Sequence, residues 1–160
     1  GKALKTGLLD GAGKILAVFN VDFWDVQALV SARELLSTDY DVVVCSKNMP
    51  GSKDLRSPFR RMLTKIFNNI VLSFVFDYPG TDTHGIKMFS REKILPIIEV
   101  CKTDRDLVDT EIILRSYKAG LRIVEIPISC EEKRKSNYGI VRHMPRIIKD
   151  VTRLYFLLRS

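Results

Sequence analysis

The sequence is poor in the features that build metal clusters, disulfide frameworks and membrane spans. Its three cysteines, Cys45, Cys101 and Cys130, are far apart and form no C-x-x-C pair, so a zinc cluster and a disulfide framework are both poor interpretations. We expect them to be small core residues in a reducing compartment. The apolar run at 70–76 has seven residues, whereas a membrane span needs about 18 or more.

Positive charge is what the sequence has in excess, with a formal net charge of +7. Basic residues crowd the stretches 53–65 and 133–149, the first with one acid and the second with none. Such patches attract the phosphates of a nucleic acid, a nucleotide or a lipid head group, although each could equally be a solvated helix face. We predict no nucleic-acid partner, because exposed aromatic residues that could stack on bases are not interleaved with these patches.

Apolar periodicity predicts a single domain over 1–160 in which strands alternate with helices. Strands are predicted at 15–21, 40–46, 86–89 and 121–128, and the main helices at 26–36, 58–76, 106–119 and 143–159. This order indicates an α/β fold with a mostly parallel sheet flanked by helices. Because the chain opens on what reads as a helix tail, and so few parallel strands would leave an edge and a face uncovered, we expect an N-terminally incomplete domain.

Three residues predict where elements begin and end. Asp25 stands where a helix N-cap would stand, directly before an apolar-periodic segment. Gly120 predicts the end of the helix that precedes it. Pro127 lies inside the last predicted strand, and since proline cannot donate to a strand ladder, it indicates an edge position or a strand end.

Four segments, in the same order and spacing, resemble family 2 glycosyltransferases, which have the GT-A fold. "GKALKTGLLDGAGKILAVFNVD" resembles the family's Gly-Lys loop, helix and strand ending in Asp-x-Asp. "VVVCSKN" resembles the strand that ends in Gly-Ser-Arg, and "DTHGIKMFSRE" the segment with Asp-Thr, Gly, Phe and Arg. "VDTEIILRSYKAGLRIVEIPISCEEKRKS" resembles the acidic helix, the Glu-x-Pro strand and the basic loop after it. The likeness covers nearly the whole chain and corresponds to the C-terminal two-thirds of the family's domain. It is similar to the branch of dolichyl- and polyprenyl-phosphate sugar synthases.

The resemblance implies transfer of a sugar from a nucleotide-sugar donor, with Mg²⁺ or Mn²⁺ neutralising the diphosphate as the nucleotide leaves. Asp22 keeps the position that the family assigns to the metal, the alternative being an acid that only ends a strand. Asn20 replaces the first Asp of the motif and could hydrogen-bond the ribose or a metal-bound water. Trp24 stands where relatives often have a polar residue. Asp25 is interpreted as a helix cap rather than a ligand.

The resemblance places Asp109 and Glu111 near the acceptor, where one carboxylate could act as general base on a hydroxyl; an anionic lipid phosphate would need no base. Positions two apart on a helix diverge, so both cannot aim at one point. The alternative is an exposed helix face on which Glu111 pairs with Arg115. Asp82, with His84 beside it, is implied in the acceptor-side wall, although Asp in such a turn commonly stabilises the turn itself.

Basic and small residues are implied around the phosphates. Arg134 and Ser136 fall in the loop that relatives use over the donor diphosphate or the acceptor phosphate, and the planar fork of arginine suits bidentate binding. The alternative is that both are mobile surface residues. Arg61 is implied on the acceptor side, and Gly1 and Lys2 resemble the end of the loop beneath the nucleotide.

Two functional hypotheses follow. The first is an inverting nucleotide-sugar hexosyltransferase of cell-envelope or cell-wall synthesis, cytoplasmic and at the inner face of the membrane. Its basic helices at 56–76 and 140–159 would lie against anionic lipid or a polyprenyl-phosphate acceptor, unless their apolar faces are core. The second hypothesis, favoured by Asn20 and Trp24, is a binding or scaffold module that has lost the chemistry. We do not expect residues 1–160 to catalyse alone, because relatives hold the base and ribose with a preceding segment.

Overall fold

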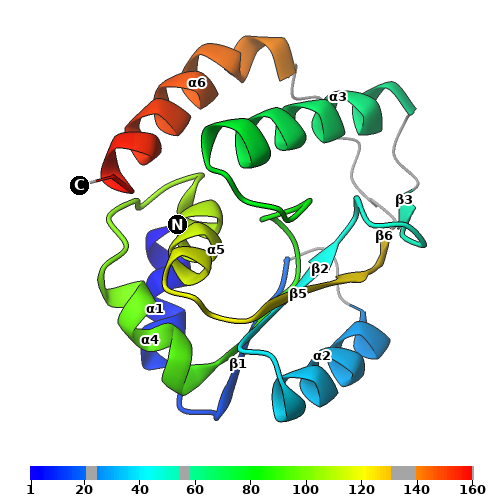
Figure 1. Ribbon diagram of the computed structural model, residues 1–160, viewed down its shortest axis with the longest axis vertical. Coiled ribbons are helices and arrows are strands. Elements are labelled where there is room, and N and C mark those ends of the chain that lie inside the picture. The colour runs from blue at the N-terminus through cyan, green and yellow to red at the C-terminus, as the bar shows by residue number, and fades with distance from the viewer. Residues whose placement is uncertain (21–24, 55–57, 131–139, 160) are drawn as a thin grey trace.

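The chain folds as α/β layers around a four-stranded sheet (Figure 1). The computed structural model describes residues 1–20, 25–54, 58–130 and 140–159. The sheet consists of β1 (Ile15–Val18), β2 (Val42–Ser46), β4 (Lys87–Ser90) and β5 (Ile123–Pro127), in the order β1-β4-β2-β5. The predicted alternation of strands with helices is confirmed.

The expectation of a mostly parallel sheet is wrong. β2 and β5 pair in parallel, but β4 lies between β1 and β2 and runs antiparallel to both. A parallel neighbour requires a crossover that returns the chain to the edge where the previous strand began. Here α3 (Pro58–Asn69) and the π-helical segment η1 (Ile70–Val75) stay beyond the end of β2, so β4 enters the sheet from that same end (Figure 1).

β1 is shorter and more exposed than the predicted buried strand over 15–21. Leu16 is buried but Ala17 is exposed, because β1 is an edge strand with one neighbour, β4. β5 is the other edge strand and ends at Pro127, so both interpretations of this proline are confirmed. The central strand β2 is buried along its whole length.

Helix α2 (Val26–Thr38) covers one face of the sheet. Its Ala32 packs with Val43 of β2 and Met88 of β4 in a small cluster. The Oδ1 atom of Asp25 accepts a hydrogen bond from the backbone N–H of Ala28 at 3.1 Å, which confirms the predicted N-cap.

The opposite face carries the main core, beneath α5 (Val108–Lys118), α1 (Lys2–Asp10) and α4 (Arg91–Glu99). Successive strand residues alternate between faces, so Val42, Val44 and Phe89 point to this side, where Ile112 and Ile113 of α5 are buried. α5 ends just before Gly120, whose φ of +76° confirms the predicted stop.

A third group of elements lies beyond the strand ends, along the top of Figure 1. It comprises α3, η1 and α6 (Ile140–Leu157), with a two-stranded parallel ladder of β3 (Lys53–Asp54) and β6 (Ser129–Cys130) beside it. Leu72 and Leu154 anchor this group in the main core. Among the described helices, none combines the length and apolarity needed to cross a membrane.

The described cysteine side chains behave as core residues. Cys45 and Cys101 are buried and free, and burial raises the pKa of both thiols to about 12. Neither is therefore a reactive thiolate near neutral pH, and both are core residues, as the sequence predicted.

Candidate functional site

One row of residues crosses the sheet near the end at which β1, β2 and β5 finish and β4 begins. Val18 pairs with Lys87, Lys87 with Val44, and Val44 with Glu125. Because neighbours in such a row point to the same face, Lys87 and Glu125 bring opposite charges to the α5 side of the sheet. We call this end of the sheet, around Lys87 and Glu125, the polar edge; the name refers to the ends of the strands and not to an edge strand.

Glu125 holds the loop that leads into β4. Its carboxylate accepts hydrogen bonds from the backbone N–H groups of Thr81 at 2.7 Å and Asp82 at 3.1 Å, and from the Thr81 hydroxyl at 2.6 Å. That hydroxyl also bonds to Ser46, the last residue of β2, at 2.8 Å. The side chain of Asn48 donates to the Thr81 carbonyl at 3.0 Å. The loop is thus fixed to β5 and to the end of β2.

The turn at 82–85 has a conformation that its residues dictate. Asp82 is buried, and its Oδ1 accepts a hydrogen bond from the N–H of His84 at 2.8 Å, which is the turn-stabilising alternative foreseen for it. The His84 side chain is exposed. Gly85 has a φ of +111°, and a Cβ there would meet the carbonyl oxygen of Cys45 at 3.2 Å, so this motif needs its glycine.

Two contacts join the turn to the first turn of α5. The hydroxyls of Thr83 and Thr110 are 2.9 Å apart and buried. The Nζ atom of Lys87 donates to the Gly85 carbonyl at 2.9 Å and to Oδ1 of Asp109 at 2.5 Å. The Lys87 side chain is 2% exposed, whereas that of Asp109 is 30% exposed. Asp109 therefore stands at the border between the interior of the polar edge and solvent.

Glu111 occupies a different environment from Asp109, although both lie in the first turn of α5. Its side chain is fully buried, and its carboxylate accepts hydrogen bonds from four groups: the N–H of Lys102, the N–H and hydroxyl of Thr103, and Nε of Arg115. Burial alone would raise the pKa of Glu111, but these hydrogen bonds together lower it below its ordinary value. The Glu111–Arg115 pair is present, but on a buried face, and it assigns Glu111 a structural role.

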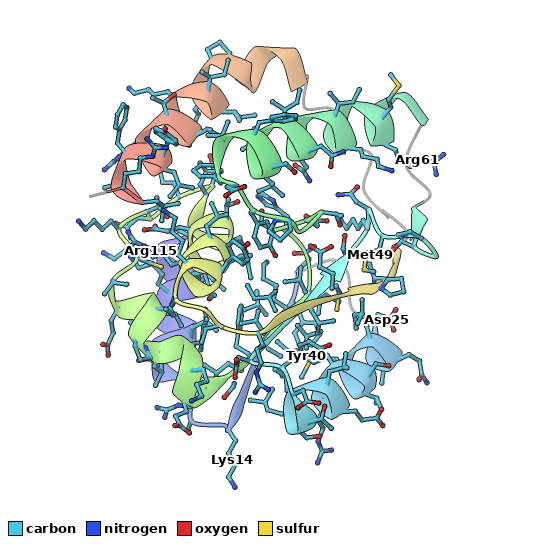
Figure 2. The ribbon with its side chains drawn as sticks, viewed as in Figure 1. Lys14, Asp25, Tyr40, Met49, Arg61 and Arg115 are labelled. Carbon is cyan, nitrogen blue, oxygen red and sulfur yellow. The ribbon has the colours of Figure 1, made fainter. Side chains whose placement is uncertain are left out.

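The remaining predicted residues lie apart from this cluster or outside the described residues. Asn20 follows β1 at the polar edge and is half-buried. Gly1 and Lys2 open α1, where the N–H of Lys2 donates to the Asp104 carbonyl at 3.1 Å. Arg61 is exposed near the start of α3, at the periphery of the molecule (Figure 2). The predicted residues outside the described part of the chain are Asp22, Trp24, Arg134 and Ser136.

The described residues do not by themselves form a cation site. Among them, no group of three His, Cys, Asp or Glu side chains is gathered as metal ligands would be. At the polar edge, Asp82 and Glu125 accept hydrogen bonds from backbone N–H groups, and Asp109 binds the Lys87 ammonium. Asp22, to which the sequence resemblance assigns Mg²⁺ or Mn²⁺, lies outside the described residues.

The sequence contained signals for two residues whose contacts were not foreseen. Lys87 interrupts the apolar strand "IKMF", and Glu125 interrupts "IVEIPI". A charge within a short apolar strand is costly unless it is paired, so each position indicated a buried polar network. The partners could not be identified, because Asp109 and Thr81 are 22 and 44 residues away.

Comparison of the sequence with known proteins indicates the class of protein to which this geometry belongs. No family model matches the chain. Over most of its length, however, the chain is a distant homologue of glycosyltransferases. This bears out the resemblance seen in the sequence.

Three relatives illustrate the distance. Glycosyltransferase AglD of Haloferax volcanii is 26% identical over 160 residues, which cover 99% of this chain and 26% of AglD. A dolichyl-phosphate beta-glucosyltransferase of Saccharomyces cerevisiae is 27% identical over 175 residues, covering 99% of this chain and 52% of that protein. An uncharacterised protein of Methanocaldococcus jannaschii is 30% identical over 136 residues, which cover 80% of this chain and 55% of that protein. The chain spans between a quarter and about half the length of these relatives.

Proposed function

We propose that this chain forms the catalytic edge of a glycosyltransferase that moves a sugar from a nucleotide-sugar donor to an acceptor. The observation that carries the proposal is that the buried Lys87 joins the turn that Asp82 begins to Asp109 of α5, although the two segments are distant in the sequence. It occurs in a chain whose relatives include proteins named as glycosyltransferases. A partly exposed carboxylate at the end of a sheet is suited to act on a substrate bound there.

The proposed roles follow the two sides of a transfer reaction. On the acceptor side, Asp109 is the general base when the nucleophile is a hydroxyl, with Asp82, His84 and Arg61 lining the acceptor. A single displacement assisted by one base inverts the sugar configuration. On the donor side, we propose Gly1, Lys2, Asn20, Asp22, Arg134 and Ser136. Glu111 supports this arrangement from the interior rather than touching substrate.

We further propose that Asp22 binds Mg²⁺ or Mn²⁺ together with the donor diphosphate. Carboxylate oxygens suit these hard cations. When bound, the cation would stabilise the negative charge on the leaving nucleotide. Asn20, two residues earlier, adds an amide oxygen but no charge, so a cation would depend strongly on the diphosphate for its remaining ligands.

An exposed apolar stripe supports a lipid-linked acceptor, such as a polyprenyl phosphate, and peripheral contact with the inner face of a membrane. The stripe consists of Met62, Ile66, Ile70 and Phe74, spaced four residues apart along α3 and η1, and Phe74 is 86% exposed. It continues into a groove of about 590 Å³ between η1 and α6, lined in part by Ile148, Phe156 and Arg159. Lys65, Lys149 and Arg153 are exposed on the same helices, which suits an anionic lipid surface.

Vesicle binding tests this membrane contact. Phe74→Glu should reduce cosedimentation with phosphatidylcholine vesicles that contain an anionic lipid, because it places a negative charge in the apolar stripe. Val26→Glu is the matched control, since Val26 is an exposed apolar residue on α2, away from the stripe. Equal binding by the two variants would remove the support for a membrane-facing stripe.

The alternative function is a binding or scaffold module with the same fold and no sugar transfer. Asn20 in place of an acid and Trp24 in place of a polar residue favour it. Calorimetric titration of the full-length protein with UDP- and GDP-sugars and Mn²⁺ separates the two functions. A degenerate module should show no metal-dependent heat.

Turnover of a nucleotide sugar by the full-length protein is the test of the enzymatic function. Asp22→Asn should lower turnover on the order of 100-fold or more, because a metal-binding carboxylate is lost. Asp25→Asn removes the same charge three residues away but can still cap α2, so it should retain turnover. If the Asp22 variant works as well as the Asp25 variant, the metal-dependent transfer is not supported.

A further inference from the structure

The buried Lys87 ammonium needs an explanation that packing does not supply. Lys87 opens β4 on the face of the sheet that also carries Phe89 and Val44, both in the main core. A buried ion pair can often be replaced by apolar side chains of similar volume without loss of stability. A methionine could therefore fill this position. The reason for a charged residue at this position must therefore lie in the groups that the ammonium contacts.

Those contacts join three separate segments. Lys87 belongs to β4, its Nζ donates to the Gly85 carbonyl in the 82–85 turn, and the same Nζ binds Oδ1 of Asp109 at the start of α5. The hydroxyl pair Thr83–Thr110 fixes the same two segments next to it. One buried ammonium therefore sets the position of the turn relative to the Asp109 carboxylate.

The side chain of Asp109 is consequently constrained on one side and accessible on the other. One oxygen is bound by an ammonium with almost no access to water, while the side chain as a whole is 30% exposed. The polar edge also holds the carboxylates of Asp82 and Glu125, and a nucleotide-sugar diphosphate would add negative charge. A buried ammonium offsets the repulsion that would otherwise turn Asp109 away from an anionic ligand.

We propose that Lys87 is the positioning residue for Asp109 in sugar transfer: it holds the carboxylate in its reactive orientation while an anionic substrate is bound. The inference rests on the proposed function. Lys87 acts through Asp109 and the Gly85 carbonyl rather than by touching substrate, because its side chain is 2% exposed. Its loss should thus be seen in the catalytic step and not in donor binding.

Steady-state kinetics of the full-length protein with a nucleotide sugar tests the inference. Lys87→Met should lower kcat by about 100-fold, the cost of a misplaced catalytic group, with little change in the KM for the donor. Lys87→Arg, which retains the charge, should recover part of that loss. Adding Lys87→Met to Asp109→Asn should lower kcat no further than Asp109→Asn alone, since the first substitution misplaces the carboxylate that the second has already removed.

Lys5 offers a matched control. Its Nζ also binds backbone carbonyls, those of Cys101 at 2.8 Å and Thr103 at 3.4 Å, and one aspartate, Asp104 at 3.0 Å, but it lies on α1. Lys5→Met should keep kcat within about twofold, as expected for a partly exposed ion pair whose partners are neither Asp109 nor the 82–85 turn. A kcat loss in Lys5→Met equal to that in Lys87→Met would overturn the positioning role.

The remaining outcomes separate the two proposals. Suppose that the wild-type protein transfers sugar. If Lys87→Met is then equally active, or if the kcat loss of Lys87→Met adds fully to that of Asp109→Asn, the role of Lys87 is overturned and the proposed function stands. Loss of activity in Lys87→Met that appears only as lower thermal stability, with kcat per folded molecule unchanged, also overturns it. A wild-type protein without any transfer overturns the proposed function, and the role of Lys87 with it.

Discussion

Asp109 and Glu111 lie two residues apart on α5, carry the same charge, and sit in opposite kinds of environment. Glu111 is fully buried, and its carboxylate accepts four hydrogen bonds that close the loop at 102–103 onto the helix. Asp109 is partly exposed, and one of its oxygens binds the Lys87 ammonium. Figure 2 shows Arg115, the partner of Glu111, on α5.

The difference teaches that the number of protein donors separates a structural carboxylate from a candidate catalytic one. A carboxylate has about four sites for accepting hydrogen bonds, and those of Glu111 are used within the protein. Asp109 retains capacity that faces solvent. Two acids that resemble each other in the sequence therefore differ in environment, because positions two apart on a helix point in different directions.

The largest expected effect on stability comes from removing the Glu111 carboxylate. Glu111→Ala leaves the N–H groups of Lys102 and Thr103 and the Arg115 guanidinium without their acceptor. We expect the free energy of unfolding to fall by about 3 to 5 kcal/mol, measured by urea denaturation. Glu111→Gln keeps one acceptor oxygen and should cost less; an alanine variant as stable as wild type would refute the structural role.

A smaller effect is expected from the contact that holds the 82–85 turn to α5. Thr110→Val removes one hydroxyl of the buried Thr83–Thr110 pair and leaves the other without this partner. The free energy of unfolding should fall by about 1 to 3 kcal/mol. In the double variant with Thr83→Val, the second substitution should cost less than it does alone; strict additivity would show that the two hydroxyls are not coupled.

The smallest expected difference depends on pH. The folded-state pKa of Glu111 is depressed, so the stability that this carboxylate contributes is present above its ordinary value of 4.5 and is lost as the pH falls through the folded pKa. Glu111→Gln should flatten the loss of stability below pH 4.5 relative to wild type. Parallel stability curves for the two proteins in this acidic range would contradict the assignment.

The elements of this fold were largely predictable, but the direction of one strand was not. The Asp25 cap, the Gly120 stop and the position of Pro127 follow from local rules and are confirmed. The antiparallel course of β4 depends on where α3 and η1 lie relative to the sheet, and periodicity within a helix carries no such information. The exposure of β1 likewise depends on its edge position rather than on its own residues.

The sequence resemblance named candidate site residues, whose functional roles remain predictions, but it did not reveal their contacts. Asp82 and Asp109 were identified from their motifs, and Asp82 forms the turn that its sequence favours. The role of Lys87 and the four donors to Glu111 arise from pairings across loops, which residue types alone do not specify. The predictions for Asp22, Arg134 and Ser136 remain predictions, because these residues lie outside the described residues.

Sugar-transfer turnover of Asp109→Asn and Glu111→Gln, compared side by side in the full-length protein, tests the central claim most directly. Each substitution removes one carboxylate charge from the same helical turn. We predict that Asp109→Asn lowers kcat per folded molecule by about 100-fold, in addition to the stability lost when the buried Lys87 ammonium loses its counter-charge, while Glu111→Gln lowers stability and keeps kcat per folded molecule. The reverse result, a fully active Asp109→Asn and an inactive but stable Glu111→Gln, would contradict the account.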